Sequence, residues 1–414
     1  MSARNSQVGC CAVAVTVFVL MMQLAAPALA TETHASLAEA LKGGKLSLNL
    51  RYRFESVDDD AFADNGYAST LRTALGYATA PWRGLSAKVE FQSVVDVGAA
   101  DKHNNKGAGT AWNGVSDRPV IADPDQTDIN QAYLDWRVAD GTHFRFGRQE
   151  ILLDNVRFVG NVGWRQFHQS FDAVELVTHA LPKTTLTYAY VYNQNRIFSD
   201  TKEMGSHLLN LGWDLGRAGR LTAYGYLIDY DKLSDSGLST MTYGVGWHGG
   251  VALSTSVTGL YDFEIAQQND AGDNPAHVDA GYHRVSVGAG LGIWTFKAGY
   301  EVLEGAPGKG AFSTPLATLH AWNGWADKFL QTPANGLEDV SLSVAAKIST
   351  WKLAAIYHSF DANTGNASYG SEIDLLAAWT SPWKQVFAVK AAAYDADHYS
   401  TDSTKLWAFT SWNF

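Results

Sequence analysis

The most constraining feature of this chain is a two-residue alternation of apolar and polar side chains that continues to its last residue. Residues 45–55 place five large apolar side chains, from Leu46 to Phe54, on one face and polar side chains on the other. Residues 404–414 repeat the pattern and end with Trp412 and Phe414 on the apolar face. Because successive strand residues point to opposite faces, each segment can separate hydrocarbon from water. Such a strand, stopping on a terminal Phe, is typical of bacterial outer-membrane β-barrels.

The same alternation predicts further strands along the whole chain. Most of these segments are about 10 residues long, which is the length that a tilted strand needs to cross a bilayer. We expect 18 strands, at residues 45–55, 67–79, 85–96, 128–138, 142–152, 171–178, 184–193, 206–214, 220–230, 239–247, 250–264, 279–289, 293–303, 338–348, 351–360, 369–379, 384–394 and 404–414.

The connections between these segments alternate between short and long. Short links rich in turn-forming residues lie at Pro81 to Gly84, Ala139 to Gly141, His248 to Gly250 and Ser381-Pro382. Longer polar links lie between them, at 57–66, 97–127, 153–170, 194–205, 231–238, 265–278 and 304–337. Outer-membrane barrels show this asymmetry between their two rims. The sequence therefore predicts an all-β, transmembrane, antiparallel up-and-down barrel of 18 strands, wide enough for an aqueous channel.

Aromatic residues support a membrane location. They make up 12% of the chain, and several tryptophans fall near predicted strand ends, where rings of intermediate polarity lie at lipid headgroups. These are Trp82, Trp213, Trp294, Trp351, Trp383 and Trp412. The alternative is a soluble β-sandwich or β-helix that packs its aromatic residues inside. No ordered repeat of 20 to 50 residues is visible, which argues against a propeller or solenoid.

The amino-terminal segment is typical of an export signal. A cation at Arg4 precedes an apolar run from Cys10 to Leu24, and Ala28-Leu29-Ala30 follows as a small-residue cleavage site. We therefore expect residues 1–30 to be a cleaved signal peptide and residues 31–414 to form the barrel. Cys10 and Cys11 both lie in the signal, so we expect no disulfide or Cys-ligated metal in the mature protein.

The charge balance and the motif content narrow the function classes. Beyond residue 30 the chain has 30 Lys and Arg against 42 Asp and Glu, so its surface is poorly suited to nucleic acid. Zinc-protease, α/β-hydrolase and phosphate-loop motifs are absent from the sequence, and we expect no enzyme activity. Two alternatives stay open: a barrel enzyme with catalytic residues on its rim, and a secreted saccharide-binding or saccharide-degrading β protein.

Arginine is concentrated in the first half of the chain. Thirteen arginines lie between residues 31 and 230, whereas Arg284 alone follows. Alternation predicts a basic arc on the inward face of the first five strands, a usual device for attracting carboxylates or phosphates through a pore. The alternative is a mesh of salt bridges with Glu55, Glu90, Asp96 and Asp135 that stiffens the wall. The candidate solute-path residues on this arc are Arg51, Arg53, Arg72, Lys88, Glu90, Arg137 and Arg145.

Residues 147–174 combine charged, amide and aromatic side chains in a predicted loop. Arg148, Arg157, Arg165 and Gln166 could bind carboxylates and hydroxyls beside aromatic rings that stack on sugars. Strict alternation directs Arg148 toward lipid, so we expect a β-bulge at Gly147 to redirect it. The alternative is a rigid surface loop that pairs its own charges.

This segment also carries a resemblance to a known family. The runs Gly147 to Glu150, Asp154 to Gly160, Gly163 to Gln166 and Phe171 to Val174 resemble the motif of the alginate-export family. The resemblance extends from the Arg51-Tyr52-Arg53 strand to the carboxyl terminus. It implies an 18-stranded outer-membrane barrel whose arginine-rich lumen passes a polyuronate, and it makes Arg148, Arg157, Arg165 and Gln166 candidates for the solute path.

The expected partners follow from this picture. They are outer-membrane lipid and lipopolysaccharide, an anionic saccharide or small anion as solute, and periplasmic export machinery if the transport is export. We expect a monomeric barrel that works without a cofactor. The aspartates at 58–60, 64, 123, 125 and 128 could bind a structural calcium ion, although such runs are more often solvated loop tips.

Overall fold

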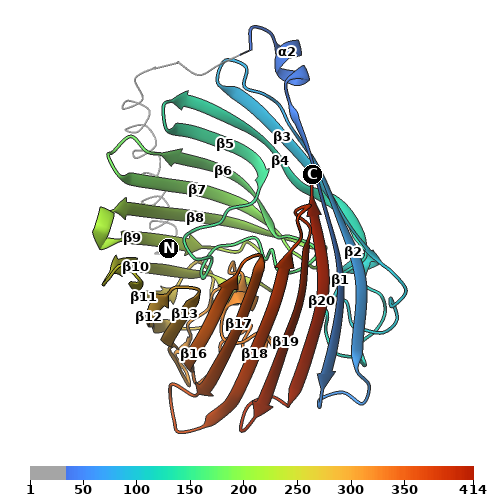
Figure 1. Ribbon diagram of the computed structural model, residues 1–414, viewed down its shortest axis with the longest axis vertical. Helices are drawn as coiled ribbons and strands as arrows, with labels where there is room; N and C mark the ends of the chain where they lie inside the picture. Colours follow the sequence, from blue (N-terminus) through green and yellow to red (C-terminus); the bar gives the residue numbers. More distant parts are fainter. Residues whose placement is uncertain (1–33) are drawn as a thin grey trace.

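In a computed structural model, residues 34–414 form one closed β-barrel (Figure 1). The 18 barrel strands are β1(Lys45–Asp59), β2(Gly66–Ala78), β3(Leu85–Asp96), β4(Gln126–Ala139), β5(Thr142–Gln149), β6(Ser170–Thr178), β7(Thr184–Asn195), β8(Thr201–Asp214), β9(Arg220–Ile228), β10(Thr240–Ala252), β11(Val257–Asp270), β12(Asp279–Leu291), β13(Trp294–Leu303), β16(Leu337–Ile348), β17(Trp351–Asp361), β18(Ser368–Thr380), β19(Val386–Ala396) and β20(Ser403–Asn413). The predicted signal peptide, residues 1–30, lies outside the described residues.

Short elements accompany the barrel. A one-turn helix precedes it, a two-stranded ribbon lies in the longest loop, and short 3₁₀ turns lie in the connections. They are α2(Leu37–Lys42), β14(Gly305–Ala306), β15(Gly310–Ala311), η1(Gly109–Ala111), η2(Gly216–Ala218), η3(Ser236–Leu238) and η4(Leu319–Ala321). Among residues 34–414, no helix has the length and apolarity that a membrane crossing needs.

The strands form an antiparallel meander that closes on itself. Each barrel strand pairs with the next one along the chain, and β20 pairs with β1 from Asn49 opposite Asn413 to Asp59 opposite Ser403. Closure leaves no barrel strand with an unpaired edge, as a hydrocarbon environment requires. The predicted 18-stranded up-and-down barrel is confirmed.

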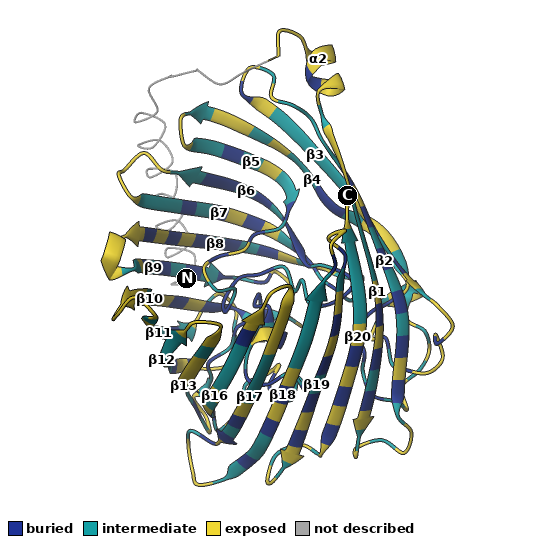
Figure 2. Ribbon diagram, viewed as in Figure 1, coloured by how far each residue is buried: buried dark blue, intermediate teal, exposed yellow. Residues whose placement is uncertain are grey.

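Alternation of side chains distinguishes the two faces of the wall. On β1, Leu46 is 74% exposed whereas Arg53 is 1% exposed, and on β20 Leu406 is 49% exposed whereas Lys405 is 6% exposed. Figure 2 shows the same banding of buried and exposed residues along the strands. The outer face is therefore apolar, and the polar residues point into the barrel.

One predicted turn was wrong. We expected His248 to Gly250 to join two strands, but β10 continues through them and the chain turns at residues 253–256. A Cβ atom on Gly249 would lie 2.4 Å from the Tyr261 hydroxyl of β11. This glycine therefore allows a close approach between strands, which a sequence pattern does not distinguish from a turn.

Three long loops lie at the rim opposite the chain termini, and the last two of them fold inward and fill part of the barrel. They are the 97–125 loop, the 150–169 loop and the 304–336 loop. Phe158 and Val159 of the second loop and Leu316 of the third form a buried core with inward-facing Tyr282 and Phe360 of the wall. The 150–169 loop and the 304–336 loop lie inside the ring of strands in Figure 1. The loops, and not the wall alone, therefore determine the free width of the lumen.

Candidate functional site

The 150–169 loop spans the lumen and docks on the opposite wall. It leaves β5, forms a bridge between Val159 and Leu316 of the 304–336 loop, and returns to β6. The Arg157 guanidinium, which is 1% exposed, donates from Nε to Glu301 Oε1 of β13 over 2.8 Å. Its Nη2 also donates to Asn323 Oδ1 of the 304–336 loop over 3.1 Å. Arg157 thus holds the loop to the far wall.

A second anchor is the Asp327 cluster, which we define as Asp327, Arg165, His320 and Lys405. Asp327 Oδ2 accepts from Arg165 Nη2 at 3.1 Å and from Lys405 Nζ at 3.0 Å, and its Oδ1 lies 2.7 Å from His320 Nδ1. These residues come from both inward loops and from β20. Burial alone would raise the pKa of Asp327, but its cationic and hydrogen-bonding neighbours hold it well below the usual value.

Lys390 of β19 lies in an aromatic cage. Its Nζ is 3.5 Å from the ring centroid of Trp325, 4.2 Å from that of Trp164 and 5.3 Å from that of Trp407. Trp164 and Trp325 belong to the two inward loops, whereas Trp407 belongs to β20. His320 Nε2 lies 2.6 Å from the same ammonium. The Trp cage, meaning these three tryptophans around Lys390, therefore also connects the loops to the wall.

The 97–125 loop joins this assembly through Asp123. Its carboxylate accepts from Arg53 Nη2 and, through Oδ1, from the Gln166 backbone N–H at 2.9 Å. Gln166 is fully buried and donates its amide to Thr70 Oγ1 of β2 at 2.9 Å. Among residues 34–414 no cluster of His, Cys, Asp and Glu has a metal-binding arrangement. Calcium in the acidic loops stays a prediction.

A polar cavity of about 450 Å³ lies in the lumen between the 150–169 loop and the end of the barrel that carries the chain termini. Inward side chains of β1 to β4 and β20 line it, together with the loop. Its polar lining residues are Ser47, Asn49, Arg51, Arg72, Glu90, Gln131, Glu150, His168, Ser411 and Asn413. Three of the predicted solute-path residues, Arg51, Arg72 and Glu90, thus meet in one place. We call this space the luminal cavity.

Arg51 and Arg72 are adjacent across β1 and β2 but are bound differently. Arg51 is bound to the 150–169 loop: Nε donates to Gln166 Oε1 at 2.6 Å, Nη1 to Gly163 O at 3.0 Å and Nη2 to Arg165 O. Arg72 is 5% exposed and donates from Nη1 to Asn49 Oδ1 at 2.5 Å, while its Nε is buried without a partner. Within residues 34–414, neither guanidinium has a carboxylate at ion-pair distance.

The acidic residues of the cavity pair with groups other than Arg51 and Arg72. Glu90 Oε2 pairs with Lys88 Nζ at 3.1 Å, and Glu150 Oε1 accepts from His168 Nδ1 at 2.9 Å. Burial alone would raise the pKa of Glu150, but hydrogen bonds from His168, Asn130 and Asn161 outweigh it and hold the pKa at about 2. Burial lowers the pKa of His168, as do the charges of Arg72 and Arg51. Glu150 is therefore ionised at neutral pH.

The remaining predicted residues lie apart from the luminal cavity. Arg137 is exposed near the turn between β4 and β5, with no ion pair among the described residues. Arg145 pairs on the inner wall with Asp135 at 3.2 Å and with Glu175 at 3.3 Å. The acidic partners of Arg145 agree with the salt-bridge mesh that the sequence left open, whereas Arg137 takes no part in it.

Arg148 faces outward, and the bulge expected at Gly147 is absent. Pairing between β4 and β5 runs without a register shift from Asp135 opposite Arg145 to Ala132 opposite Arg148. Gly147 takes a positive φ of 120°, yet Arg148 stays on the face of exposed Phe146. Its Nε donates to Asp172 Oδ1 of β6 at 2.8 Å. The strand does not bulge to direct Arg148 inward. The carboxylate of Asp172 instead balances its charge on the outer face.

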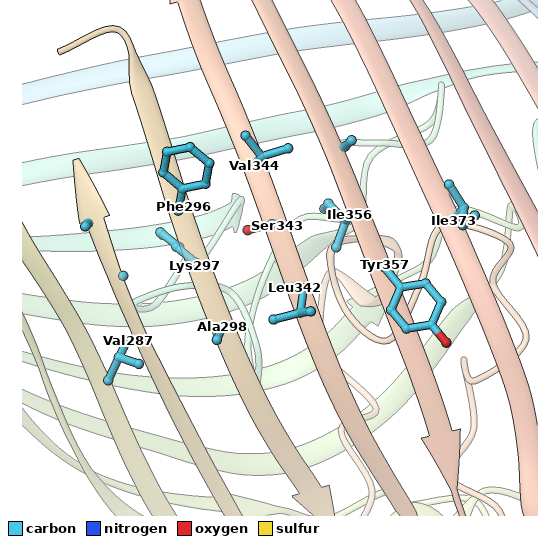
Figure 3. A pocket seen from close by; sticks show the side chains of 13 residues that line it. Val287, Phe296, Lys297, Ala298, Leu342, Ser343, Val344, Ile356, Tyr357 and Ile373 are labelled. Atoms are coloured by element: carbon cyan, nitrogen blue, oxygen red, sulfur yellow. The ribbon is translucent and has the colours of Figure 1, made fainter. Parts of the chain in front are cut away.

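A larger hollow, of about 760 Å³, lies on the outside of the wall over β12, β13, β16, β17 and β18. Figure 3 shows it lined by apolar side chains such as Phe296, Leu342 and Tyr357, which are 44%, 56% and 44% exposed. Small Ala298, paired with Leu342, forms part of its floor. Because these residues lie on the lipid-facing side of the strands, the hollow is not part of the solute path.

Several site residues were missed in the sequence. Alternation along the strands places Asn49, Lys390 and Lys405 inward, but it gives no indication of their partners. Glu150 and His168 lie in a predicted loop and meet only because that loop enters the barrel. The 304–336 loop, which supplies Asp327, carried no recognisable signal.

A family comparison agrees with this geometry. The model of the family described as alginate export matches residues 44–303, which contain β1 to β13 and the 150–169 loop. The chain belongs to the alginate-export family. Membership of this family, together with the closed barrel and its apolar outer face, places the chain in the bacterial outer membrane as a channel. The expected family is confirmed.

Solved structures with the same architecture have low sequence identity to this member of the alginate-export family. OpdK of Pseudomonas aeruginosa, solved with vanillate, has a TM-score of 0.71 at 14% identity, covering 90% of this chain and 99% of its own. OccAB2 of Acinetobacter baumannii gives 0.70 at 14%, covering 91% and 99%. OccD3 (OpdP) of P. aeruginosa gives 0.67 at 13%, covering 91% and 92%. These likenesses show the fold. A search of curated proteins gives no match.

Proposed function

We propose that this outer-membrane channel selects small acidic solutes, above all short uronate oligosaccharides, as they pass through the luminal cavity. The observation that carries the proposal is the pair formed by Arg51 and Arg72. They are register partners, they line the cavity, and neither has a carboxylate at ion-pair distance within residues 34–414. A passing carboxylate would supply the missing counter-ion.

The width of the path favours short solutes over an extended polymer. The cavity of about 450 Å³ falls within the usual range of small-molecule sites, roughly 300–1,000 Å³. Above it, the 150–169 loop crosses the lumen and is fixed by Arg157, by the Asp327 cluster and by the Trp cage. A polymer would need these contacts to open, whereas a short oligomer would need less displacement.

Two comparisons support the chemistry of the solute. The family is described as alginate export, and alginate is a polymer of uronic acids. OpdK, which shares the fold, was solved with vanillate, which is also a carboxylate. Passage of an intact polyuronate is the second candidate function, favoured by the family match, and it requires the inward loops to swing out.

Reversal potentials in planar bilayers test the proposal. The wild-type channel in a salt gradient should prefer anions, and Arg72→Gln should reduce that preference because it removes a positive charge that has no ion-pair partner from the path. The matched control is Arg217→Gln, an exposed arginine on the turn between β8 and β9. A cation-preferring wild type, or equal shifts in both variants, would refute the assignment.

Solute passage separates the two candidates. Proteoliposomes should take up labelled glucuronate and short uronate oligomers and exclude polymer while the loops are docked. Entry of long polymer at the same rate as dimer would support the second candidate. No uptake of any acidic sugar would contradict both.

A further inference from the structure

The geometry points to a phospholipid site on the outside of the barrel, in the hollow over β12, β13, β16, β17 and β18. The ligand is one phospholipid of the periplasmic leaflet. One of its acyl chains fills the hollow, and its ester groups lie at the tryptophans of the nearby rim. The site faces away from the luminal cavity, so the inference goes beyond the proposed function.

The hollow arises because small outward side chains lie among large ones. Ala298 of β13 pairs with Val287 of β12 on one side and with Leu342 of β16 on the other, and Figure 3 shows it between these two residues. Ala355 of β17 lines the same space of about 760 Å³. On β1, by contrast, the outward positions from Leu46 to Phe54 all carry large apolar side chains. The outer wall is therefore recessed at β12 to β18 by the choice of residue.

The depth of the hollow in the membrane assigns it to one leaflet. The short turns at residues 292–293 and 349–350 mark the periplasmic rim. Trp294 of β13 and Trp351 of β17 follow these turns on the outward face, each four residues before one of the two alanines. A tilted strand climbs roughly 2.5 Å per residue, so the alanines lie roughly 10 Å from the tryptophans in an apolar band about 25 Å tall. Acyl chains at this depth belong to the periplasmic leaflet, which consists of phospholipid.

Van der Waals packing favours an acyl chain over a second barrel as the occupant. The hollow opens toward hydrocarbon, where burial of apolar surface brings no hydrophobic free energy and only the fit between atoms distinguishes one neighbour from another. A narrow, flexible chain can follow the space between Phe296 and Tyr357. In a two-fold dimer the same patch faces itself, so each hollow would meet the hollow of its partner and stay unfilled.

The tryptophans of the rim supply polar contacts for the other end of the lipid. Trp294 and Trp351 are 44% and 46% exposed, and within residues 34–414 they contact other rings but make no hydrogen bond. An indole N–H is a donor only, and the ester carbonyl groups of a phospholipid are acceptors at the same level of the membrane. The esters therefore bind at the tryptophans while one chain extends to the alanines.

Native mass spectrometry of the delipidated barrel, incubated with palmitoyl-oleoyl phosphatidylethanolamine, tests the inference. The wild type should retain one phospholipid per barrel after the detergent is removed. Ala298→Phe places a ring in the hollow and should lower the retained fraction by about 10-fold. Ala355→Leu fills another part of the hollow with a smaller side chain and should lower it in the same direction. The matched control is Ala408→Phe, at an exposed outward alanine of β20, which should retain the lipid like the wild type.

A photoreactive phospholipid locates the bound chain. With a diazirine in one acyl chain, illumination of the barrel in phospholipid vesicles should label peptides of β13, β16 and β17 more strongly than peptides of β1 and β20. This labelling should fall in Ala298→Phe and persist in Ala408→Phe. Uniform labelling around the wall would show an ordinary fluid lipid layer and would overturn the site.

The remaining outcomes are equally decisive. A wild type that retains no phospholipid, or equal retention in Ala298→Phe and Ala408→Phe, would refute the inference. Preferential retention of lipopolysaccharide would refute the assignment to the periplasmic leaflet. A dimer that Ala298→Phe dissociates would show that the hollow is an interface between copies. The reversal potential of Ala298→Phe should equal that of the wild type, so loss of the lipid site would leave the proposed function standing.

Discussion

The luminal cavity and the Asp327 cluster lie in the same barrel and are rich in the same residue types, but their charges are balanced differently. In the cluster, Arg165 meets Glu55 at 3.2 Å and Asp327 at 3.1 Å, and Lys405 shares the second carboxylate. In the cavity, Arg51 and Arg72 have no such partner within residues 34–414. The ion-paired cations of the cluster fix the loops. Arg51 has no ion pair but also binds a loop, so Arg72 is the cation that we propose to meet a solute. The partner, more than the residue type, decides the role of an arginine in this lumen.

The largest expected effect comes from disrupting the Asp327 cluster. Asp327→Ala leaves Arg165, Lys405 and His320 around a buried site without their shared acceptor, at a cost of about 3–5 kcal/mol. We expect the loops to undock, which should raise single-channel conductance and expose the 150–169 loop to protease. Asp140→Ala, on an exposed turn, is the control. An unchanged conductance would show that the cluster does not hold the loops.

Acidification should weaken the docking of the loops at the Asp327 cluster. Burial, reinforced by the charges of Lys390 and Arg165, lowers the pKa of His320 to about 3 despite the opposing effect of Asp327. Above pH 6.5 the docked and undocked states are both neutral at His320. Below pH 6.5, His320 binds a proton in the undocked state but not in the docked state. The free energy that favours docking therefore falls by up to about 1.4 kcal/mol per pH unit until the pH nears 3.

We therefore expect the open probability of the channel to rise between pH 7 and pH 5. In His320→Gln this rise should be largely lost, because glutamine can donate to Asp327 and accept from Lys390 without titrating. The carboxyl of Asp327, whose pKa lies below its ordinary value, adds to the effect only at still lower pH. Identical pH profiles for the two proteins would assign the response to another group.

A smaller effect is expected at the Trp cage. Lys390→Met keeps the aliphatic stem but removes the ammonium from the faces of Trp164, Trp325 and Trp407, contacts worth roughly 0.5–2 kcal/mol. Loop openings should become more frequent, and tryptophan emission should change. Lys297→Met, an exposed lysine on β13, is the matched control. Equal opening rates in both variants would show that the Lys390 ammonium does not contribute to loop docking.

The sequence was sufficient for the barrel but not for the partner of each charge. Alternation of side chains depends only on the strand, so it correctly predicted 18 strands and the inward direction of Arg51 and Arg72. The position of Asp327 beside Arg165 depends on two loops 162 residues apart that meet inside the barrel. No local pattern records such a contact. The basic arc was therefore visible, while its division into paired and unpaired arginines was not.

Gly249 and Gly147 show a second limit of local patterns. Both were interpreted as breaks in a strand, a turn in one case and a bulge in the other. In the structure the first lets Tyr261 approach and the second takes a positive φ within a continuous register. A glycine marks a special backbone or packing requirement. It does not specify which one.

Arg148 supplies the prediction with the smallest effect, and it tests the comparison from outside the lumen. This guanidinium lies on the outer face, is paired with Asp172 and is partly exposed, so the pair contributes about 0–1 kcal/mol. Arg148→Gln should leave the reversal potential and glucuronate uptake unchanged, although it removes the same charge as Arg72→Gln. If both variants shifted selectivity equally, total charge and not access to the lumen would govern the channel. The distinction between paired and unpaired arginines would then lose its functional meaning.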